Sequence, residues 1–498
     1  MAAEPAPIPA APKRSIWRNW ISLTGAVVGG GSFFSFLLLF AFDLLAGEHS
    51  NPYVGILSYV VAPTFLFIGI ALLLFGAWLQ RRNQRRDPDA RAPQLSIDLE
   101  NPRDRRRLVV FALGTMTFLL FSALGSFQTY HLTETVEFCG KVCHEPMKPE
   151  FTAYQNGTHA RVACVECHVG NGAAFYLKSK INGAHQLWGV ISGHYQHPIP
   201  TPVSNLRPAQ DTCEKCHWPQ RFSGNLERTY NHTLAGDGGK TFTIRLLLHV
   251  GGGDSQHGLL GGIHWHTNKE NHVEYYAEDE QRLKIPWVRV SKPDGTSTVY
   301  RNPEFKGEPD AAKIRTMDCL DCHNRPAHRY KSPNEAVDQA LYLGKIDTKL
   351  PAAKRTIVDL LTKTYATETE AAAAIESGLR SQYGDSPAAT QAIATVTTIY
   401  KENFFPFMKA DWSKYPEHIG HKDWPGCFRC HDNQHEAIGN PEKKMAASDC
   451  TTCHTILAQG SGAELTKLAP EGLIFKHPET IPEGLTCSDC HNGKNQSP

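Results

Sequence analysis

The chain has 498 residues, which is too many for a single domain. Hydrophobic residues make up 41% of it, yet its mean hydropathy is −0.35, so any membrane-embedded part is a minority of the length. The formal net charge of +1 gives no indication of nucleic-acid binding, and we expect none.

The N-terminal region contains three long apolar runs. Residues 1–15 are rich in Ala and Pro and are predicted to be disordered. The runs Ile21–Gly47, Tyr53–Leu79 and Leu108–Phe127 are each close to or above the roughly 20 residues that a membrane-spanning helix needs. The first run is too long for a cleavable signal peptide and lacks a clear cleavage site. We therefore predict a membrane domain of three transmembrane helices over residues 16–130.

Basic residues orient these helices. Lys13, Arg14 and Arg18 precede the first run, and the segment 80–107 between the second and third runs holds nine arginines. Basic residues favour the cytoplasmic side of a membrane, so the N-terminus and this Arg-rich loop are predicted to be cytoplasmic. The third helix then leaves the membrane on the opposite side, which makes the chain from residue 131 onward periplasmic in a bacterial inner membrane.

The cysteines carry the strongest pattern in the sequence. All 14 fall in seven pairs, and a histidine follows the second cysteine of every pair. This is the motif that attaches haem c: two thiols bind the porphyrin and the histidine binds the iron. Zinc sites or disulfides would not require a histidine after each pair. The predicted attachment residues are Cys139, Cys143, Cys164, Cys167, Cys213, Cys216, Cys319, Cys322, Cys427, Cys430, Cys450, Cys453, Cys487 and Cys490, with His144, His168, His217, His323, His431, His454 and His491.

Seven covalently bound haems c (iron) are thus the predicted cofactors, and the periplasmic region is predicted to be a multihaem cytochrome with little regular structure. Residues 131–330 carry four motifs and include a β-rich insertion without cysteine at 221–315. Residues 331–411 are predicted to be a helical spacer, with N-cap signatures at Ser332, Thr367 and Ser386. Residues 412–498 carry the last three motifs, and the whole fold is of mixed class.

An iron that only transfers electrons needs a second axial ligand, and 17 of the 24 histidines lie outside the motifs. An isolated histidine is otherwise a polar surface residue. Six stand near a motif and are the candidate distal ligands: His159, His328, His418, His421, His435 and His477. His264 and His266, in the insertion, are alternates or solvent-facing residues. Met147 follows the first motif and is a candidate thioether ligand there, or else a packing residue.

Residues 108–328 resemble the NapC/NirT/NrfH family of membrane-anchored quinol dehydrogenases. The resemblance rests on a membrane helix followed at once by a motif with a nearby Met, on His159 in THARVACVECH, and on CLDCHNRPAH with His328. The whole chain looks like the larger inner-membrane members of that family that carry seven haems. The family pattern at the first haem is CxxCHxM, whereas this chain has CxxxCHxxM.

The resemblance implies a quinol site beside the first haem, with a lysine and an acidic residue after the second motif. Lys178 or Lys180 matches the lysine, and His185 or Gln186 stands where the acid is expected.

The residues themselves also suggest proton acceptors between the third apolar run and the first motif, namely His131, Glu134 and Glu137. These side chains alternatively only mark the polar end of a membrane helix.

The predicted function is oxidation of menaquinol or ubiquinol in the bilayer, with electrons passed to periplasmic cytochromes or a reductase in a respiratory chain. The alternative is a non-enzymatic electron-transfer subunit docked on a separate quinol-oxidising or reductase partner. A terminal reductase needs an iron with an open position, and every motif here ends in histidine while further histidines are plentiful.

Overall fold

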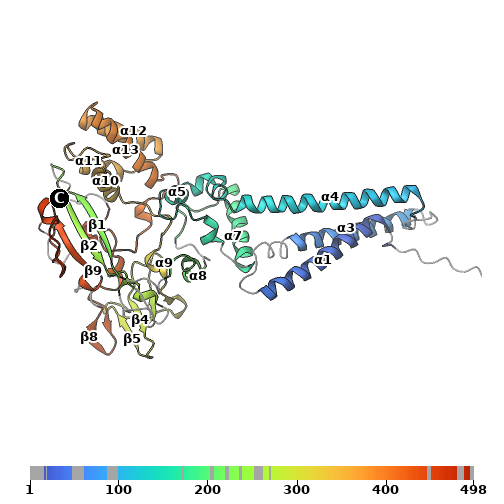
Figure 1. The fold of residues 1–498 in the computed structure, drawn as a ribbon, viewed down its shortest axis with the longest axis horizontal. Coiled ribbons are helices and arrows are strands. Elements are labelled where there is room, and N and C mark those ends of the chain that lie inside the picture. Colours follow the sequence, from blue (N-terminus) through green and yellow to red (C-terminus); the bar gives the residue numbers. More distant parts are fainter. Residues whose placement is uncertain are drawn as a thin grey trace, which may run out of the picture. The chain divides into compact units, whose positions relative to one another are not determined.

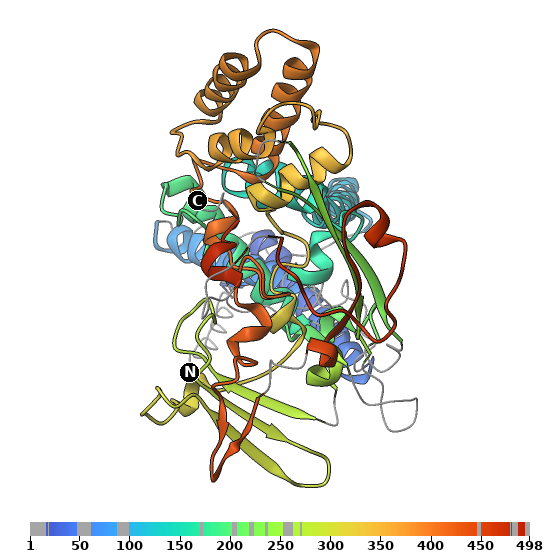
Figure 2. The same ribbon diagram turned by 90° about the vertical axis from the view of Figure 1, so that its left-hand side faces the viewer.

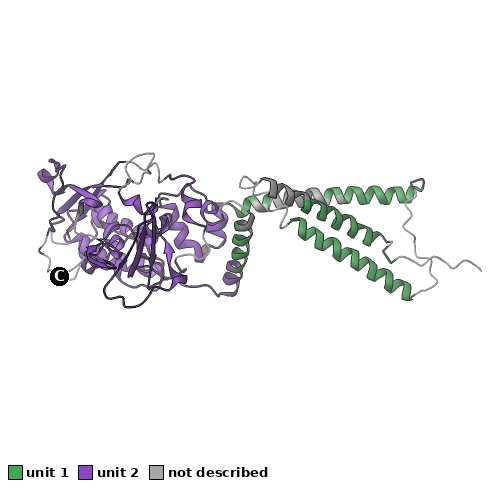
Figure 3. Ribbon diagram, turned by 90° about the horizontal axis from the view of Figure 1, so that it is seen from below, with its two compact units in different colours: residues 1–134, 169–185 green, residues 135–168, 186–498 purple. Residues whose placement is uncertain are grey.

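The computed structural model describes residues 16–17, 19–46, 61–86, 99–169, 173–201, 207–218, 224–234, 238–251, 262–268, 271–445, 450–478, 480 and 487–493. The chain divides into two compact units (Figure 3). The first comprises residues 1–134 and 169–185, and the second comprises 135–168 and 186–498.

The first unit consists of long helices, labelled in Figure 1. They are α1 (Trp20–Ala46), α3 (Ala62–Arg86), α4 (Pro102–Thr133) and the start of α7 (Ala173–Ser192). Helix α4 begins at Pro102 because the Asn101 side chain accepts a hydrogen bond from the Arg103 N–H, 3.0 Å away.

Helices α1 and α3 pack through glycines. A Cβ atom on Gly69 would collide with the backbone of Gly29, and one on Gly25 would collide with the backbone of α3. Small residues let two helix backbones approach this closely, as is typical of helix pairs in membranes. The Ser22 hydroxyl adds a hydrogen bond to the Leu73 carbonyl, 3.1 Å away.

Two helical segments among the described residues are long and apolar enough to cross a membrane, Trp20–Leu37 and Ala62–Arg86. They correspond to the first two predicted spans, although residues 53–60 lie outside the described part of the chain. The third predicted span, Leu108–Phe127, falls within α4, but most of its side chains lie outside the described residues. That span stays a prediction.

The second unit contains a helical block with the largest buried core. Its helices are α10 (Pro333–Tyr342), α11 (Ala353–Thr362), α12 (Glu368–Tyr383) and α13 (Pro387–Asn403). The side chains of Ser332, Thr367 and Ser386 accept N-terminal N–H groups, as their cap signatures predict. The apolar faces meet in a fully buried cluster that includes Val337, Ile357, Ile375, Leu379 and Val396.

Two antiparallel sheets complete the second unit. The three-stranded sheet has the order β1 (Leu226–Thr233), β2 (Thr241–Leu248), β9 (His454–Gly460). The six-stranded sheet has the order β6 (Arg315–Thr316), β3 (His272–Tyr276), β4 (Trp287–Ser291), β5 (Ser297–Arg301), β7 (Glu436–Ala437), β8 (Asn440–Lys444). Figure 2 shows the β7–β8 hairpin extending the strands of the insertion. Both sheets therefore join the predicted insertion to the last part of the chain.

The remaining elements of the second unit are short, and several carry the cysteine motifs. They are η3 (Phe138–Val142), α5 (His144–Gln155), α6 (Cys164–His168), α8 (Ala209–Cys213), η5 (Ile263–Thr267), η6 (Ala311–Lys313), α9 (Cys319–Cys322), η7 (Trp412–Lys414), η8 (Gly426–Arg429), η9 (Cys450–Thr452), η10 (Gly462–Leu465) and α14 (Cys487–Cys490).

Candidate metal centres

The motifs form single helical turns. In the third, fourth and fifth motifs, the backbone N–H of His217, His323 or His431 donates to the carbonyl of the first cysteine of its motif, at 2.8, 2.8 and 3.1 Å. A turn of this kind places residues three and four apart on one face. The first motif has one more residue between its cysteines, and the chain accommodates it in the π-helical turn η3.

Six motif histidines each face one histidine from outside the motifs. Among the described residues, every histidine–histidine ring contact has this composition. The pairs, with their ring-centre distances, are His217–His159 at 6.1 Å, His168–His328 at 6.2 Å, His323–His264 at 6.4 Å, His431–His266 at 5.8 Å, His454–His421 at 6.3 Å and His491–His477 at 5.9 Å.

These distances fit a metal ion bound between two imidazoles. A metal–nitrogen bond of about 2.0 Å on each side, with roughly 1 Å more from each nitrogen to its ring centre, separates the two centres by roughly 6 Å. Direct ring stacking would bring the centres closer together. The residues present therefore fit a haem iron with two histidine ligands, next to two cysteines that attach the porphyrin.

The hydrogen bonds of the non-motif histidines support this role. The Nδ1 atoms of His159, His328 and His266 lie 3.0, 3.0 and 2.8 Å from backbone carbonyl oxygens. That of His264 lies 2.5 Å from the Val250 carbonyl. A carbonyl only accepts, so each Nδ1 carries the proton and each Nε2 keeps its lone pair for a metal. Metal-binding histidines are commonly held in this way.

Two of the predicted distal ligands, His418 and His435, have both ring nitrogens in contact with protein groups. The His418 Nε2 donates to the Gln281 carbonyl at 3.0 Å, and its Nδ1 lies 3.1 Å from the Arg429 guanidinium. Both ring nitrogens of His435 are also hydrogen bonded, Nδ1 to Asp432 at 2.8 Å and Nε2 to the Ile285 carbonyl at 2.7 Å. Among the described residues, neither ring contacts a motif histidine, and the ligand role of both stays a prediction.

His264 and His266, which the sequence gives as alternates, face the motif histidines His323 and His431. Their signal in the sequence is a histidine pair in a cysteine-free insertion, IHWHT, which folds as η5.

Burial favours the neutral form of four motif histidines. Desolvation lowers the pKa of His168, His323 and His454, and it lowers the pKa of His491 to about 4. The neutral imidazole is the form that binds a metal.

Cysteines of successive motifs lie next to each other. The Cys139 thiol hydrogen-bonds to Cys164 and lowers the pKa of the Cys164 thiol to about 7. The Cys213 thiol likewise lowers the pKa of Cys319. Two further couples are close enough to interact electrostatically, Cys167 with Cys216 and Cys322 with Cys427. The first five motifs thus follow one another in space in chain order.

In the first motif, the side chain of His144 lies outside the described residues. Met147 is half-buried and lies three residues further along α5. Glu137 is exposed and immediately precedes η3. Gly140 packs against the Phe151 ring, leaving no room for a side chain. The thioether ligation of this haem stays a prediction.

The candidate quinol residues of the first unit form an ion-paired group, Lys180 with Glu134, and an exposed group, Lys178, His185 and His131. The Lys180 ammonium donates to Glu134 at 2.6 Å and to the Thr133 hydroxyl at 3.3 Å, which fastens α7 to the end of α4. Lys178 and His185 are both exposed, and a spacing of seven residues puts them on one face of α7. His131 is exposed on the last turn of α4.

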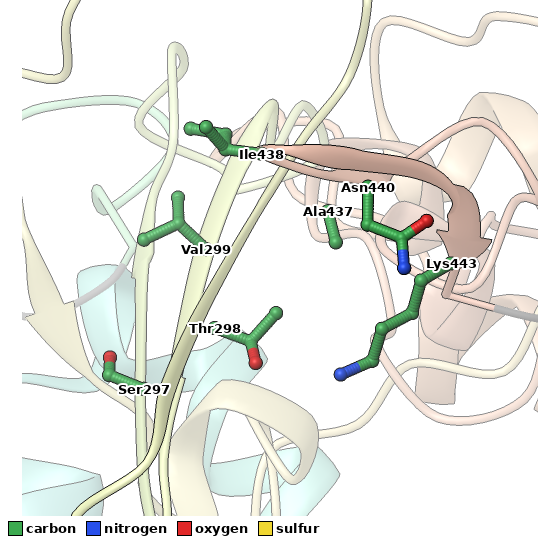
Figure 4. A pocket seen from close by; sticks show the side chains of 7 residues that line it. All are labelled: Ser297, Thr298, Val299, Ala437, Ile438, Asn440 and Lys443. Atoms are coloured by element: carbon green, nitrogen blue, oxygen red, sulfur yellow. The ribbon is translucent and has the colours of Figure 1, made fainter.

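A depression on the six-stranded sheet does not coincide with these groups. Its volume is about 410 Å³, and it lies between β5 and the β7–β8 hairpin (Figure 4). Its lining is made by Ser297, Thr298, Val299, Ala437, Ile438, Asn440 and Lys443. None of these residues is a predicted site residue.

Paired histidines beside CxxCH motifs, in a chain with apolar N-terminal helices, define a membrane-associated cytochrome of the c type with several haems. The sequence profile of the NapC/NirT cytochrome c family, N-terminal region, matches residues 102–199. Over the whole chain, the sequence is 41% identical to the cytochrome c-type protein ImcH of Geobacter sulfurreducens, covering 96% of this chain and 95% of that protein. The protein therefore belongs to the NapC/NirT family of cytochromes c, as the sequence resemblance predicts. No solved structure matches it.

Proposed function

We propose that the protein oxidises a quinol in the bacterial inner membrane and passes the electrons through seven covalently bound haems c to periplasmic redox partners. The observation that carries the proposal is the set of six histidine pairs, each joining a CxxCH motif to a distal histidine. Haem iron with two histidine ligands supplies reversible one-electron transfer and no open position for a substrate. This favours an electron-transfer protein over a terminal reductase.

Oxidation of one quinol to quinone releases two electrons and two protons, so two one-electron acceptors and a proton acceptor are required. Lys178 and His185 share an exposed face of α7, in the same unit as the membrane helices. The Lys178 ammonium is suited to donate a hydrogen bond to a quinol oxygen. The His185 imidazole stands in the place of the family's acidic residue and is suited to accept a proton.

Glu134 has a different role in this proposal. Its carboxylate is already engaged by Lys180 at 2.6 Å and is largely buried. Its hydrogen-bonding capacity is used within the protein rather than toward a substrate. The Lys180–Glu134 pair therefore positions α7, and the two quinol protons pass in turn through His185 or the exposed His131 to bulk water.

The route of the electrons follows from the cysteine neighbours. Cysteine neighbours link the first motif to the second, the second to the third, the third to the fourth and the fourth to the fifth, so that haems attached at these motifs would be neighbours in chain order. The Arg-rich loop 80–107 supports the cytoplasmic placement of the N-terminus and hence the periplasmic placement of the motifs.

The test is reduction of the purified, haem-loaded protein by menaquinol and ubiquinol analogues. We expect reduction of the wild type, a roughly tenfold slower rate for Lys178→Ala from the lost hydrogen bond, and a roughly 100-fold slower rate for His185→Ala from the lost proton acceptor. Lys292→Ala, an exposed lysine in a turn of the insertion, is the charge-matched control and should not change the rate. Reduction by dithionite should be unaffected in all variants.

Failure of both quinol analogues to reduce the wild type would overturn the proposal. The protein would then receive its electrons from a separate quinol-oxidising subunit.

A further inference from the structure

The fourth and fifth motifs take their distal histidines from one turn. His264 faces His323 of the fourth motif and His266 faces His431 of the fifth, and both belong to η5 with a single residue between them. The Nδ1 hydrogen bonds to the Val250 and Ile263 carbonyls fix both rings. Two irons whose ligands lie two residues apart on a rigid turn must lie close together.

A second contact joins the same two motifs directly. Arg429 lies between the cysteines of the fifth motif and is only 9% exposed. Its guanidinium donates to the carbonyl of Asp321, which lies between the cysteines of the fourth motif, at 2.9 Å. It also donates to the Arg282 carbonyl at 3.0 Å and, through Nε, to the Gly426 carbonyl at 2.8 Å.

The Asp321 side chain anchors this contact in the six-stranded sheet. Its carboxylate is 1% exposed and accepts from the Tyr275 hydroxyl at 2.6 Å and from Arg282 at 2.5 Å. The Asp321 carboxylate is thus bound by Arg282, whereas Arg429 donates to uncharged carbonyl oxygens. The buried positive charge of Arg429 acts on attachment cysteines of both motifs, Cys322 and Cys430.

We infer that η5 and Arg429 hold the haems of the fourth and fifth motifs as one coupled pair, through which electrons cross from the first four motifs to the last three. This inference rests on the proposed haem count. His264 and His266 are the ligands of that pair, and Arg429 is a positioning residue. Its buried charge favours the reduced iron, which carries one positive charge less.

The ligand assignment is tested on haem-loaded protein with His264→Ala and His266→Ala, and with His272→Ala as control, an exposed histidine on β3. Electron paramagnetic resonance of the oxidised protein should show one additional high-spin haem in each of the first two variants and none in the control. The haem content by mass spectrometry should stay unchanged, because the cysteines are intact. Wild-type spectra from both variants would overturn the assignment.

His264→Met provides a second test if the alanine variants do not fold. It keeps a ligand at the iron, and a thioether in place of an imidazole should raise the midpoint potential of one haem. Potentials that all match the wild type would contradict the role of His264.

The role of Arg429 is tested by a potentiometric titration with dithionite. Arg429→Gln should lower the midpoint potentials of two haems, whereas Arg429→Lys, which keeps the charge, should restore them toward the wild type. Arg289→Gln, at a more exposed ion pair on β4, should leave all potentials in place. Unshifted potentials in Arg429→Gln would refute the electrostatic role. These titrations do not use quinol, so they decide the inference whether or not quinol is the donor.

Discussion

His418 and His421 lie three residues apart, and the sequence gives both the same expected role as distal ligands. Their contacts in the structure differ. His418 is 4% exposed and uses both ring nitrogens in hydrogen bonds to protein groups, whereas His421 faces the motif histidine His454 at 6.3 Å. Replacing each by alanine should therefore produce two different defects.

The cost of His418→Ala can be worked out from its contacts. The substitution removes the hydrogen bond to the Gln281 carbonyl, at about 1 kcal/mol, while the Asp321 carbonyl keeps its bond from Arg429. The space left by the imidazole adds about 2 kcal/mol. The sum is about 3 kcal/mol, which in a unit of roughly 350 residues lowers the unfolding midpoint by roughly 4 °C.

The assay combines thermal unfolding with the spin state of the oxidised haems. His418→Ala should unfold at the lower temperature and keep the low-spin spectrum of the wild type. His421→Ala should show one new high-spin haem, because it removes the partner of His454. A high-spin haem in His418→Ala, together with an unchanged unfolding midpoint, would refute the reasoning and restore His418 as a ligand.

Two further predictions concern stability. Asp338→Asn should cost about 3–5 kcal/mol, because it leaves the buried Lys354 ammonium, 2.9 Å from the carboxylate, without its counter-charge, and Lys354→Met in the same chain should recover most of the loss. Burial raises the pKa of Asp338, but hydrogen bonds from His232, Lys354 and a backbone N–H outweigh it, so the pKa of this carboxyl is lowered overall. The ionised carboxylate therefore stabilises the fold above the ordinary Asp pKa, and this stabilisation is lost as the pH falls through the lowered pKa. Acid unfolding should therefore be steeper for the wild type than for Asp338→Asn, and equal slopes would contradict this. Gly69→Leu should separate α1 from α3, because even a Cβ atom at this position collides with Gly29. The expected result is a lower yield of membrane-inserted protein. The control is Gly114→Leu on α4, where a Cβ atom meets open space, and a normal yield of both variants would refute the packing.

The sequence predicts those features that local chemistry determines. The attachment motifs need only five or six consecutive residues, and the helices of the second unit begin at Ser332, Thr367 and Ser386 because a cap needs only its own first turn. His159 and His328 could be proposed as ligands from their positions near a motif. Their partners could not, because His159 faces the third motif and His328 faces the second.

Whether a histidine binds iron also depends on what occupies its nitrogens. For His418 and His435, the groups that compete with iron for the ring nitrogens include the carbonyls of Gln281 and Ile285. These residues are distant in the sequence, so no local pattern predicts the contacts. For His264 and His266 the position of η5 depends on pairings of the six-stranded sheet, which lie beyond the reach of residue spacing.

The same non-local contacts argue against two separable haem modules in this chain. The distal histidines of the fourth and fifth motifs lie in the insertion, strand β9 of the sixth motif pairs with β2, and Arg429 of the fifth motif is bound to Asp321 of the fourth. Truncating the chain between residues 331 and 411 would remove strands β7, β8 and β9, of which β7 and β9 pair with the insertion, and the Arg429 contact to Asp321. The insertion is therefore expected to hold the two haem groups together. The first four motifs expressed without residues 412–498 should lose the fixed position of η5 and, with it, the distal ligand His264 of the fourth haem.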